Sequence, residues 1–258
     1  MDINHVKFGY DKKNILITDL SANIGKGKIT SIIGPNGCGK STLLSLLTKL
    51  NKPQCGNILI DGQEIGLLKG KAFAKKVASV FQINDGNRDL SVEEFVSYGR
   101  VPHKSGFGSL SSDDDAIIAQ SLEDTGLANM KDKRLCNMSG GERQRVYIAM
   151  ALCQQPEILF LDEPTSYLDM YYQLEVLEIV KKINRDKGIT VIMVLHDVNQ
   201  ALSYSDDIIV MKDGAIVTSG AANDIVNEKL IADVYGVECR RLNVYEGLDY
   251  FLPIKTLN

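Results

Sequence analysis

The stretch "GPNGCGKS", Gly34 to Ser41, decides the fold class of this 258-residue chain. It matches the pattern G-x-x-x-x-G-K-[ST] and stands between the apolar run "ITSII" and a helical pattern that begins near Thr42. Glycines in such a loop let backbone N–H groups curl around a phosphate, and the helix start that follows adds positive partial charge. A plain glycine-rich turn would have no packing reason for Lys40 and Ser41 at that point. The stretch therefore predicts a nucleotide-binding phosphate loop, in which the lysine neutralises the outer phosphates.

Three further apolar runs share the layout of the strand before this loop. "VASVF" precedes Gln82, "EILFL" precedes Asp162, and "VIMVL" precedes His196. Polar or glycine-rich residues and then a helical pattern follow each run, which is typical of a parallel sheet. Because ligands of open α/β sheets bind at the carboxyl ends of the strands, we expect the four strand ends to deliver their polar residues to one crevice.

Two adjacent carboxylates end the run "ILFLDEP". Asp162 suits a Mg²⁺ shell, and Glu163 could accept a proton from the water that attacks the γ-phosphate. An acidic pair that caps the next helix explains the same residues equally well when they are considered alone. His196 could bind a phosphate oxygen, and Gln82 could bind Mg²⁺ or position water, but each in isolation is better explained as a hydrogen-bonding residue at a strand end.

The segment "NMSGGERQR" predicts a helix start that is open to an anion. Ser139 and Glu142 have capping-box spacing, and the helical pattern runs on to a stop before Pro156. Gly140 and Gly141 each cost roughly 1 kcal/mol in a helical turn, which suggests that something approaches the backbone closely. A bare helix N-terminus is an anion site. Since the phosphate loop already holds the chain's own nucleotide, we expect this site to receive the γ-phosphate of ATP on another chain.

The remaining patterns predict the organisation of the chain. Strand-like runs give way to helical patterns, including one with Ser112 and Asp115 at capping-box spacing, and predict a helical subdomain inserted at approximately residues 83–156. Two β-rich runs flank Asp213-Gly214 and predict a hairpin. The tail after Tyr235 shows no clear element.

Composition limits the class of protein. With 29 basic and 33 acidic residues the net charge is −4, which argues against a general nucleic-acid binder. The longest apolar runs are strand-sized, whereas a membrane-spanning helix needs about 20 residues. No signal-peptide pattern follows Met1, so we expect a cytoplasmic chain. Five cysteines without a CxxC pair argue against a zinc site and against a disulfide framework.

Taken together, these motifs and their order resemble the ATP-binding-cassette (ABC) ATPases over nearly the whole chain. The resemblance implies an α/β P-loop NTPase fold with a mainly parallel sheet core, an antiparallel β subdomain and the inserted helical subdomain, all in a single domain over residues 1–258. In the family's terms "GPNGCGKS" is the Walker A loop, "MSGGE" the signature, "ILFLDE" the Walker B strand and "SYLD" the D-loop, while Gln82 is the Q-loop glutamine and His196 the switch histidine.

The resemblance also implies a role for individual residues. Tyr10 matches the aromatic residue that stacks on adenine. The family's ATP-binding positions fall on Tyr10, Gly34, Pro35, Asn36, Gly37, Cys38, Gly39, Lys40, Ser41, Thr42, Ser139, Gly140, Gly141 and Asp169. The implied Mg²⁺ ligands are Ser41, Gln82 and Asp162, and the implied catalytic groups are Glu163, His196 and Gln82. The family's head-to-tail homodimer would hold two ATP molecules between the Walker A loop of one chain and the signature of the other.

Three segments resemble a narrower group, the importers of ferric siderophores, haem and cobalamin: "GRVPHKSGFGSLSSDD", "TSYLDMYYQLEVLEIV" and "VLHDVNQALSYSD". Met138, Glu142 and Tyr172 depart from the usual pattern, where Leu, Gln and His are commoner. The resemblance implies an ATPase subunit that lies peripherally on the cytoplasmic face of the membrane. Its partners would be integral-membrane permease subunits and, indirectly, an extracytoplasmic substrate-binding protein, with no nucleic acid.

Other functions remain as alternatives. Siderophore systems are the most numerous of the group, so we expect a ferric siderophore as cargo, with haem or cobalamin as the alternatives. An ABC ATPase of DNA repair or translation should carry a long coiled-coil insertion or a second cassette, and the sequence has neither. A metal-binding or interaction module without turnover would have no need of Glu163 beside Asp162.

Overall fold

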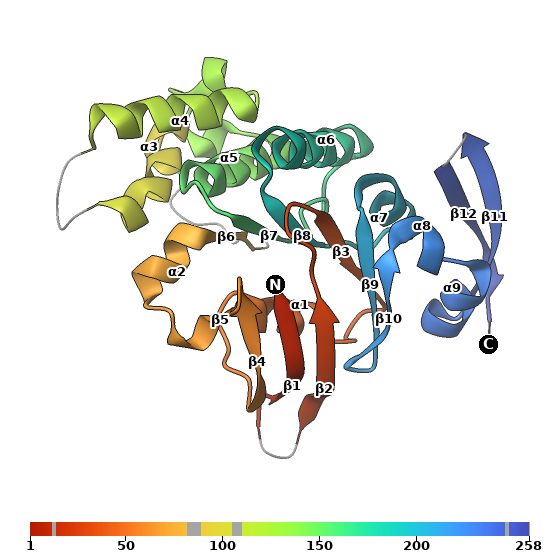
Figure 1. Cartoon of the computed structure of the whole chain (residues 1–258). Helices are drawn as coiled ribbons and strands as arrows, with labels where there is room; N and C mark the ends of the chain where they lie inside the picture. The colour runs from red at the N-terminus through yellow and green to blue at the C-terminus, as the bar shows by residue number, and fades with distance from the viewer. Residues whose placement is uncertain (12–13, 82–88, 105–109, 246–247, 258) are drawn as a thin grey trace. The chain divides into compact units, whose positions relative to one another are not determined.

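The structure is a computed structural model that describes residues 1–11, 14–81, 89–104, 110–245 and 248–257 (Figure 1). The chain divides into two compact units. Met1–Leu67 and Ile192–Asn258 form the first unit, and Leu68–Val191 form the second. Gln82, one of the predicted site residues, lies outside the described residues.

The first unit contains an antiparallel sheet with the strand order β2-β1-β4-β5. Its strands are β1 (Asp2–Gly9), β2 (Ile15–Asn23), β4 (Cys55–Ile60) and β5 (Gln63–Glu64), and the short helix η1 (Ile65–Leu67) follows. Ile3, Val6 and Phe8 of β1 are buried, and the register with β2 shifts between Ile3 and Val6 and again between Val6 and Phe8. This sheet confirms the antiparallel β subdomain that the family resemblance implies.

The first unit also contains the strand that leads to the phosphate loop. Every residue of β3 (Ile29–Ile33) is buried, as expected for a strand covered on both faces. It pairs in parallel with β9 (Asp207–Lys212), and β10 (Ala215–Ala221) continues antiparallel from β9. The backbone N–H of Leu195, which follows β8 (Thr190–Val194), donates to the carbonyl of Ile32 at 3.2 Å. The carboxyl ends of β3 and β8 therefore lie side by side.

The sequence predicted the hairpin of β9 and β10 but not the hairpin that the C-terminal tail forms. The hairpin at Asp213-Gly214 is confirmed, with both residues in left-handed conformation (φ 49° and 77°). The tail, for which the sequence predicted no element, forms a second hairpin of β11 (Val237–Tyr245) and β12 (Leu248–Thr256). Strand β11 contacts α9 (Glu228–Tyr235), and β12 contacts α7 (Val198–Tyr204). Figure 1 draws the hairpin and α9 in dark blue. The short helix α8 (Ala222–Ile225) follows β10.

The second unit carries the other two predicted strands. After α2 (Gly70–Lys76), strand β6 (Val77–Val80) pairs in parallel with β7 (Ile158–Asp162), and α6 (Met170–Lys187) comes later in the chain. At the start of β8, the N–H of Thr190 donates to the carbonyl of Glu157. The parallel pairs in both units confirm the α/β fold class. The delivery of all four strand ends to one crevice stays a prediction.

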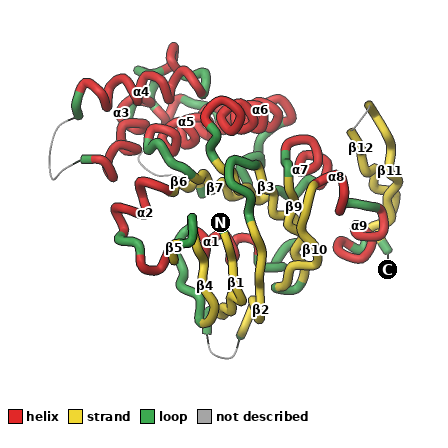
Figure 2. The backbone as a smooth tube through the Cα atoms, viewed as in Figure 1, coloured by secondary structure: helices red, strands yellow, loops and turns green. Residues whose placement is uncertain are grey.

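Helices dominate the middle of the second unit, as Figure 2 shows in red. They are α3 (Val92–Ser97), η2 (Tyr98–His103), α4 (Ser112–Asp124), η3 (Ala128–Met130), η4 (Leu135–Asn137) and α5 (Gly140–Cys153). Ten buried side chains form an apolar cluster of their own, which includes Val96, Leu122, Met138 and Val146. The helical character of this region agrees with the prediction, while the bounds 83–156 of a separate subdomain stay a prediction.

The predicted capping box of α4 was wrong by one residue. Ser111 is the N-cap, and its partner is Asp114, rather than Ser112 with Asp115. The Asp114 carboxylate also forms an ion pair with Arg100, with 2.7 Å between Nε and Oδ1. A tertiary contact therefore accompanies the register that the helix adopts. Over the described ranges, every helix is too short or too polar to cross a bilayer.

Candidate nucleotide-binding and hydrolysis site

The phosphate loop follows β3 directly and ends at the start of α1 (Lys40–Leu47). At Gly34 a Cβ atom would lie 2.1 Å from the carbonyl oxygen of Met211, so close contact with β9 excludes any larger residue. Gly39 is the N-cap of α1 and has φ 105°, a conformation that favours glycine. The loop can therefore bring its backbone close to a ligand without side chains in the way.

Lys40 is buried, and its ammonium group lies inside the loop. Nζ donates to the carbonyl oxygens of Gly34 at 2.8 Å and Pro35 at 3.0 Å. Asn36 and Gly37 form the exposed rim of the loop. A positive charge held at the centre of a ring of backbone groups suits a polyphosphate.

Cys38 and Ser41 have different surroundings in the loop. Cys38 is buried, its carbonyl accepts from the N–H of Gly214, and burial raises the pKa of its thiol although the nearby Lys40 opposes this rise. The Cys38 side chain therefore contributes packing. Ser41 is exposed in the first turn of α1, where its hydroxyl is available to a ligand.

Tyr10 stands beside the end of the loop. Its hydroxyl lies 3.1 Å from the hydroxyl of Thr42, and its ring packs edge-on against Phe8 with 5.2 Å between the ring centroids. Tyr10 is nevertheless 69% exposed. A large aromatic face that is fixed at its edge and open to solvent suits stacking on a base.

His196 is exposed at the carboxyl end of β8, within the same unit as the loop. The next residue, Asp197, caps α7: its carboxylate accepts from the N–H groups of Asn199 at 2.7 Å and Gln200 at 3.2 Å. Tyr235 lines a pocket together with His196. Burial raises the pKa of its phenol, and the backbone of Gly34 partly opposes the rise. Tyr235 thus lies close to the first residue of the phosphate loop.

The helix start in "MSGGE" is capped as predicted. The Ser139 hydroxyl accepts from the N–H of Glu142 at 3.3 Å, and the Glu142 carboxylate accepts from the N–H of Ser139 at 2.7 Å. Burial alone would raise the pKa of Glu142, but hydrogen bonds from Ser139 and Lys133 lower it below its usual value. Glu142 therefore stays charged and holds the cap.

The two glycines of this helix start have different surroundings. A Cβ on Gly141 would lie 2.3 Å from Cγ of Tyr172, so this glycine makes room for a side chain of its own chain. A Cβ on the exposed Gly140 would meet only Cδ2 of Leu168, at 3.6 Å, an ordinary contact. The contact with Tyr172 therefore gives Gly141 a packing reason within the chain, whereas Gly140 has no such close neighbour. The binding of an outside ligand at either glycine stays a prediction.

Asp169 caps the helix turn that carries Tyr172. It is the N-cap of α6, and its carboxylate accepts from the N–H of Tyr172 at 3.1 Å. Through Tyr172, this capped first turn of α6 contacts Gly141 in the first turn of α5. A contact between Asp169 and nucleotide stays a prediction.

The acidic pair lies at the end of β7, in the second unit. Asp162 is the last residue of the strand, and Glu163 has a left-handed backbone with φ 51°. A non-glycine residue in that conformation stores roughly 1–3 kcal/mol of strain, and such strain is concentrated at functional sites. The Ser166 hydroxyl donates to Oε2 of Glu163 at 3.0 Å. Sequence reasoning missed Ser166, although its i+3 spacing from Glu163 within a turn was a usable signal.

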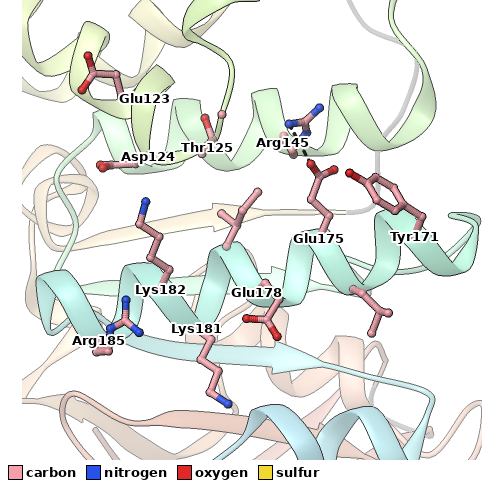
Figure 3. Close-up of a pocket in the computed structure, with 13 residues that line it drawn as sticks. Glu123, Asp124, Thr125, Arg145, Tyr171, Glu175, Glu178, Lys181, Lys182 and Arg185 are labelled. Atoms are coloured by element: carbon pink, nitrogen blue, oxygen red, sulfur yellow. Dashed lines mark ion pairs between the residues drawn. The ribbon is translucent and has the colours of Figure 1, made fainter.

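A groove of about 930 Å³ lies among α4, α5 and α6 in the second unit (Figure 3). Charged side chains of both signs line it, and Arg145 of α5 faces Glu175 of α6 with 3.2 Å between Nη1 and Oε1. None of the predicted catalytic or ATP-binding residues in the described part of the chain lines this groove. The ion pair connects α5, which begins at the signature, with α6, which begins after the D-loop.

The structure thus brings together Tyr10 with Thr42 and Lys40 with the loop carbonyls in the first unit, and Glu163 with Ser166 in the second. Comparison with known proteins shows the family to which these motifs belong. The family model described as ABC transporter matches residues 17–166. That range includes the phosphate loop, the signature and both acidic residues.

Curated relatives extend the similarity over most of the chain. The chain is 41% identical to the iron(3+)-hydroxamate import ATP-binding protein FhuC of Bacillus subtilis (strain 168), over 89% of this chain and 85% of the relative. It is 38% identical to the petrobactin import ATP-binding protein YclP of the same organism, over 100% of this chain and 96% of the relative.

A solved structure of a metal-chelate type ABC transporter in an inward-facing conformation has a TM-score of 0.86, with 25% identity over 98% of this chain and 96% of that one. The motifs, their local geometry and these similarities lead to one conclusion. The chain belongs to the ABC transporter family, as an ATPase subunit.

Proposed function

We propose that this chain is the ATP-hydrolysing subunit of an importer that energises the uptake of ferric siderophores from the cytoplasmic face of the membrane. The observation that carries the proposal is the similarity, over most of the chain, to ATP-binding proteins named for the import of an iron(3+)-hydroxamate and of petrobactin. The resemblance of the segments "GRVPH", "TSYLD" and "VLHDVNQA" to the same group supports it.

The proposed partners follow from this role. Because the subunit contributes ATP hydrolysis rather than a path across the membrane, integral-membrane permease subunits carry the cargo. An extracytoplasmic binding protein delivers the cargo to them. Cargo selectivity then belongs to those partners, and the ATPase has no need to contact iron or its chelator.

Two copies of the chain share each active site in this proposal. The exposed first turn of α5 at Gly140 supports this proposal. The chain's own capping box holds the start of the helix, while the backbone at Gly140 stays accessible. A helix N-terminus favours an anion. The anion is the γ-phosphate of ATP that is bound to the phosphate loop of the second copy.

The catalytic roles can be assigned to residues. Lys40 binds the outer phosphates, Glu163 accepts the proton of the attacking water, and Ser166 orients Glu163. His196 holds a γ-phosphate oxygen. The Ser41 hydroxyl and the Asp162 carboxylate are hard oxygen donors of the kind that Mg²⁺ prefers, and Gln82 would add an amide oxygen. Bound Mg²⁺ would supply charge neutralisation at the phosphate oxygens.

Uptake of labelled iron tests the proposed function. Disruption of the gene should abolish energy-dependent uptake of radioactive iron presented on at least one siderophore, with a hydroxamate as the first choice. Wild-type protein should restore uptake, whereas Glu163→Gln protein at equal abundance should not. Unchanged iron uptake on every siderophore tested, together with lost uptake of haem or cobalamin, would show that the cargo assignment is wrong.

A further inference from the structure

The C-terminal hairpin is bonded to the helix turn that follows His196. In the first turn of α7, the Asn199 side chain pairs with the backbone of Phe251 in β12: Nδ2 donates to the Phe251 carbonyl at 3.2 Å, and the Phe251 N–H donates to Oδ1 at 2.7 Å. The amide thus makes the two hydrogen bonds that a neighbouring strand would make. Phe251 itself is 3% exposed, so its backbone is a fixed anchor.

This connection is positioned to set the orientation of His196. The five residues of β8 before it are all buried, and the first turn of α7 begins directly after Asp197. His196 is exposed between these two elements, and its backbone direction depends on where the first turn of α7 lies. Asp197 fixes that turn internally, whereas Asn199 fixes it to β12.

The hydrogen-bonded connection stands beside an open space. A pocket of about 300 Å³ lies between the helices and the hairpin, and His196, Asn199, Tyr235 and Phe251 are among its walls. Where side chains leave such a space, close packing contributes less to holding the two elements in place. The amide pair therefore adds a directional link between the hairpin and the turn after His196 to the packing of α7 against β12.

We propose that Asn199 is a positioning residue for ATP hydrolysis: by bonding the first turn of α7 to the C-terminal hairpin, it holds His196 in the orientation that the reaction needs. The inference rests on the role of His196 in the proposed function. It gives the C-terminal tail, whose purpose the sequence did not indicate, a task in turnover rather than in stability alone.

A double-mutant cycle on the purified full chain tests this proposal, with single-turnover hydrolysis of γ-labelled ATP as the assay. Asn199→Ala should lower the hydrolysis rate about fivefold, while the Kd of a fluorescent ATP analogue changes less than about twofold. In the His196→Ala background, Asn199→Ala should cause almost no further loss, because residues that act through one group are not additive.

Two controls separate positioning from stability. Asn199→Asp keeps an acceptor for the Phe251 N–H and suits a helix N-terminus, but it loses the donor to the Phe251 carbonyl, so it should slow hydrolysis without weakening α7. Asn184→Ala removes a comparable bond, from Nδ2 to the Ile189 carbonyl at 2.8 Å at the end of α6. Asn184→Ala should lower the melting temperature by about as much as Asn199→Ala does, while the hydrolysis rate should stay unchanged.

The outcomes distinguish this inference from the function on which it rests. An equal loss from Asn199→Ala in the wild-type and His196→Ala backgrounds, or a loss that Asn184→Ala reproduces, overturns the inference and leaves the role of His196 intact. Wild-type turnover in His196→Ala would remove the role of His196 and the inference with it. Neither result bears on the cargo, which the uptake experiment tests separately.

Discussion

The surroundings of Glu163, the proposed catalytic base, restrict its conformation. Its backbone is left-handed, its side chain is half-buried, and Ser166 donates to one of its carboxylate oxygens. Glu163→Gln keeps the shape of the side chain and removes its basicity. The variant should bind ATP with a similar Kd and hydrolyse it roughly a hundredfold or more slowly.

The ATP-bound Glu163→Gln chain should also accumulate as a dimer, which size-exclusion chromatography with and without ATP would detect. The wild-type protein under turnover serves as the control. Turnover near the wild-type rate would exclude Glu163 as the base.

The three departures from the usual family residues each have a structural explanation. Met138 is buried in the apolar cluster of the helical region. Glu142 completes the capping box and accepts from Lys133 at 2.9 Å. Tyr172 lies against Gly141. The spacing of Ser139 and Glu142 predicted the cap, but no local pattern predicted the contact with Tyr172, since it depends on how two helices pack.

The two signature glycines should respond differently to substitution. Gly141→Ala places a methyl group against Tyr172, and such overpacking costs roughly 1–3 kcal/mol, so the melting temperature should fall by about 2 °C or more. Gly140→Asp makes only an ordinary contact with Leu168, at a position where a helix favours an acid, so the melting temperature should stay the same while ATPase activity is lost. Differential scanning calorimetry and an ATPase assay on both variants would show this reversal, and equal destabilisation by the two would contradict it.

At the scale of elements, the strands were the most predictable part of the chain. The run "ITSII" coincides with β3, and the other three runs fall within one residue of β6, β7 and β8, because continuous apolar residues are typical of strands buried on both faces. The cap of α4 was less predictable. Adjacent Ser111 and Ser112 offered two registers, and the bond from Arg100 to Asp114, made by a residue outside the helix, favours one.

That bond predicts a pH dependence. Hydrogen bonds from the Ser111 backbone and from Arg100 lower the pKa of Asp114 to about 2, against a usual value of 3.8. A lowered pKa means that the contribution to stability is complete above pH 3.8 and is lost as the pH falls towards 2. The difference in urea midpoint between the wild type and Asp114→Asn should therefore be constant from about pH 7 to 4.5 and shrink below about pH 4.

Asp113→Asn is the matched control, because Asp113 is exposed in the same first helical turn. It should shift the urea midpoint less than Asp114→Asn does at neutral pH. A difference for Asp114→Asn that already closes between pH 6 and 5 would contradict the lowered pKa.

At the scale of the whole molecule, the order of the motifs identified the family and hence the fold, including the antiparallel sheet of the first unit. The C-terminal hairpin was not predicted, since its contacts with α7 and α9 join segments far apart in the sequence. The proposed sharing of the active site also goes beyond one chain. The start of α5 supports this proposal, because Tyr172 contacts Gly141 while Gly140 has only an ordinary contact with Leu168.

The most direct measurement of that shared site mixes two inactive chains that carry different tags, Lys40→Ala and Gly140→Asp. Heterodimers would combine the phosphate loop of the Gly140→Asp chain with the signature of the Lys40→Ala chain into one intact site. The heterodimers are purified through both tags and assayed in a single turnover. One intact site can then hydrolyse its ATP even if repeated cycles require the two sites to act in turn. The account predicts phosphate release from these heterodimers and none from either variant alone, whereas no release from heterodimers that bind ATP would contradict it.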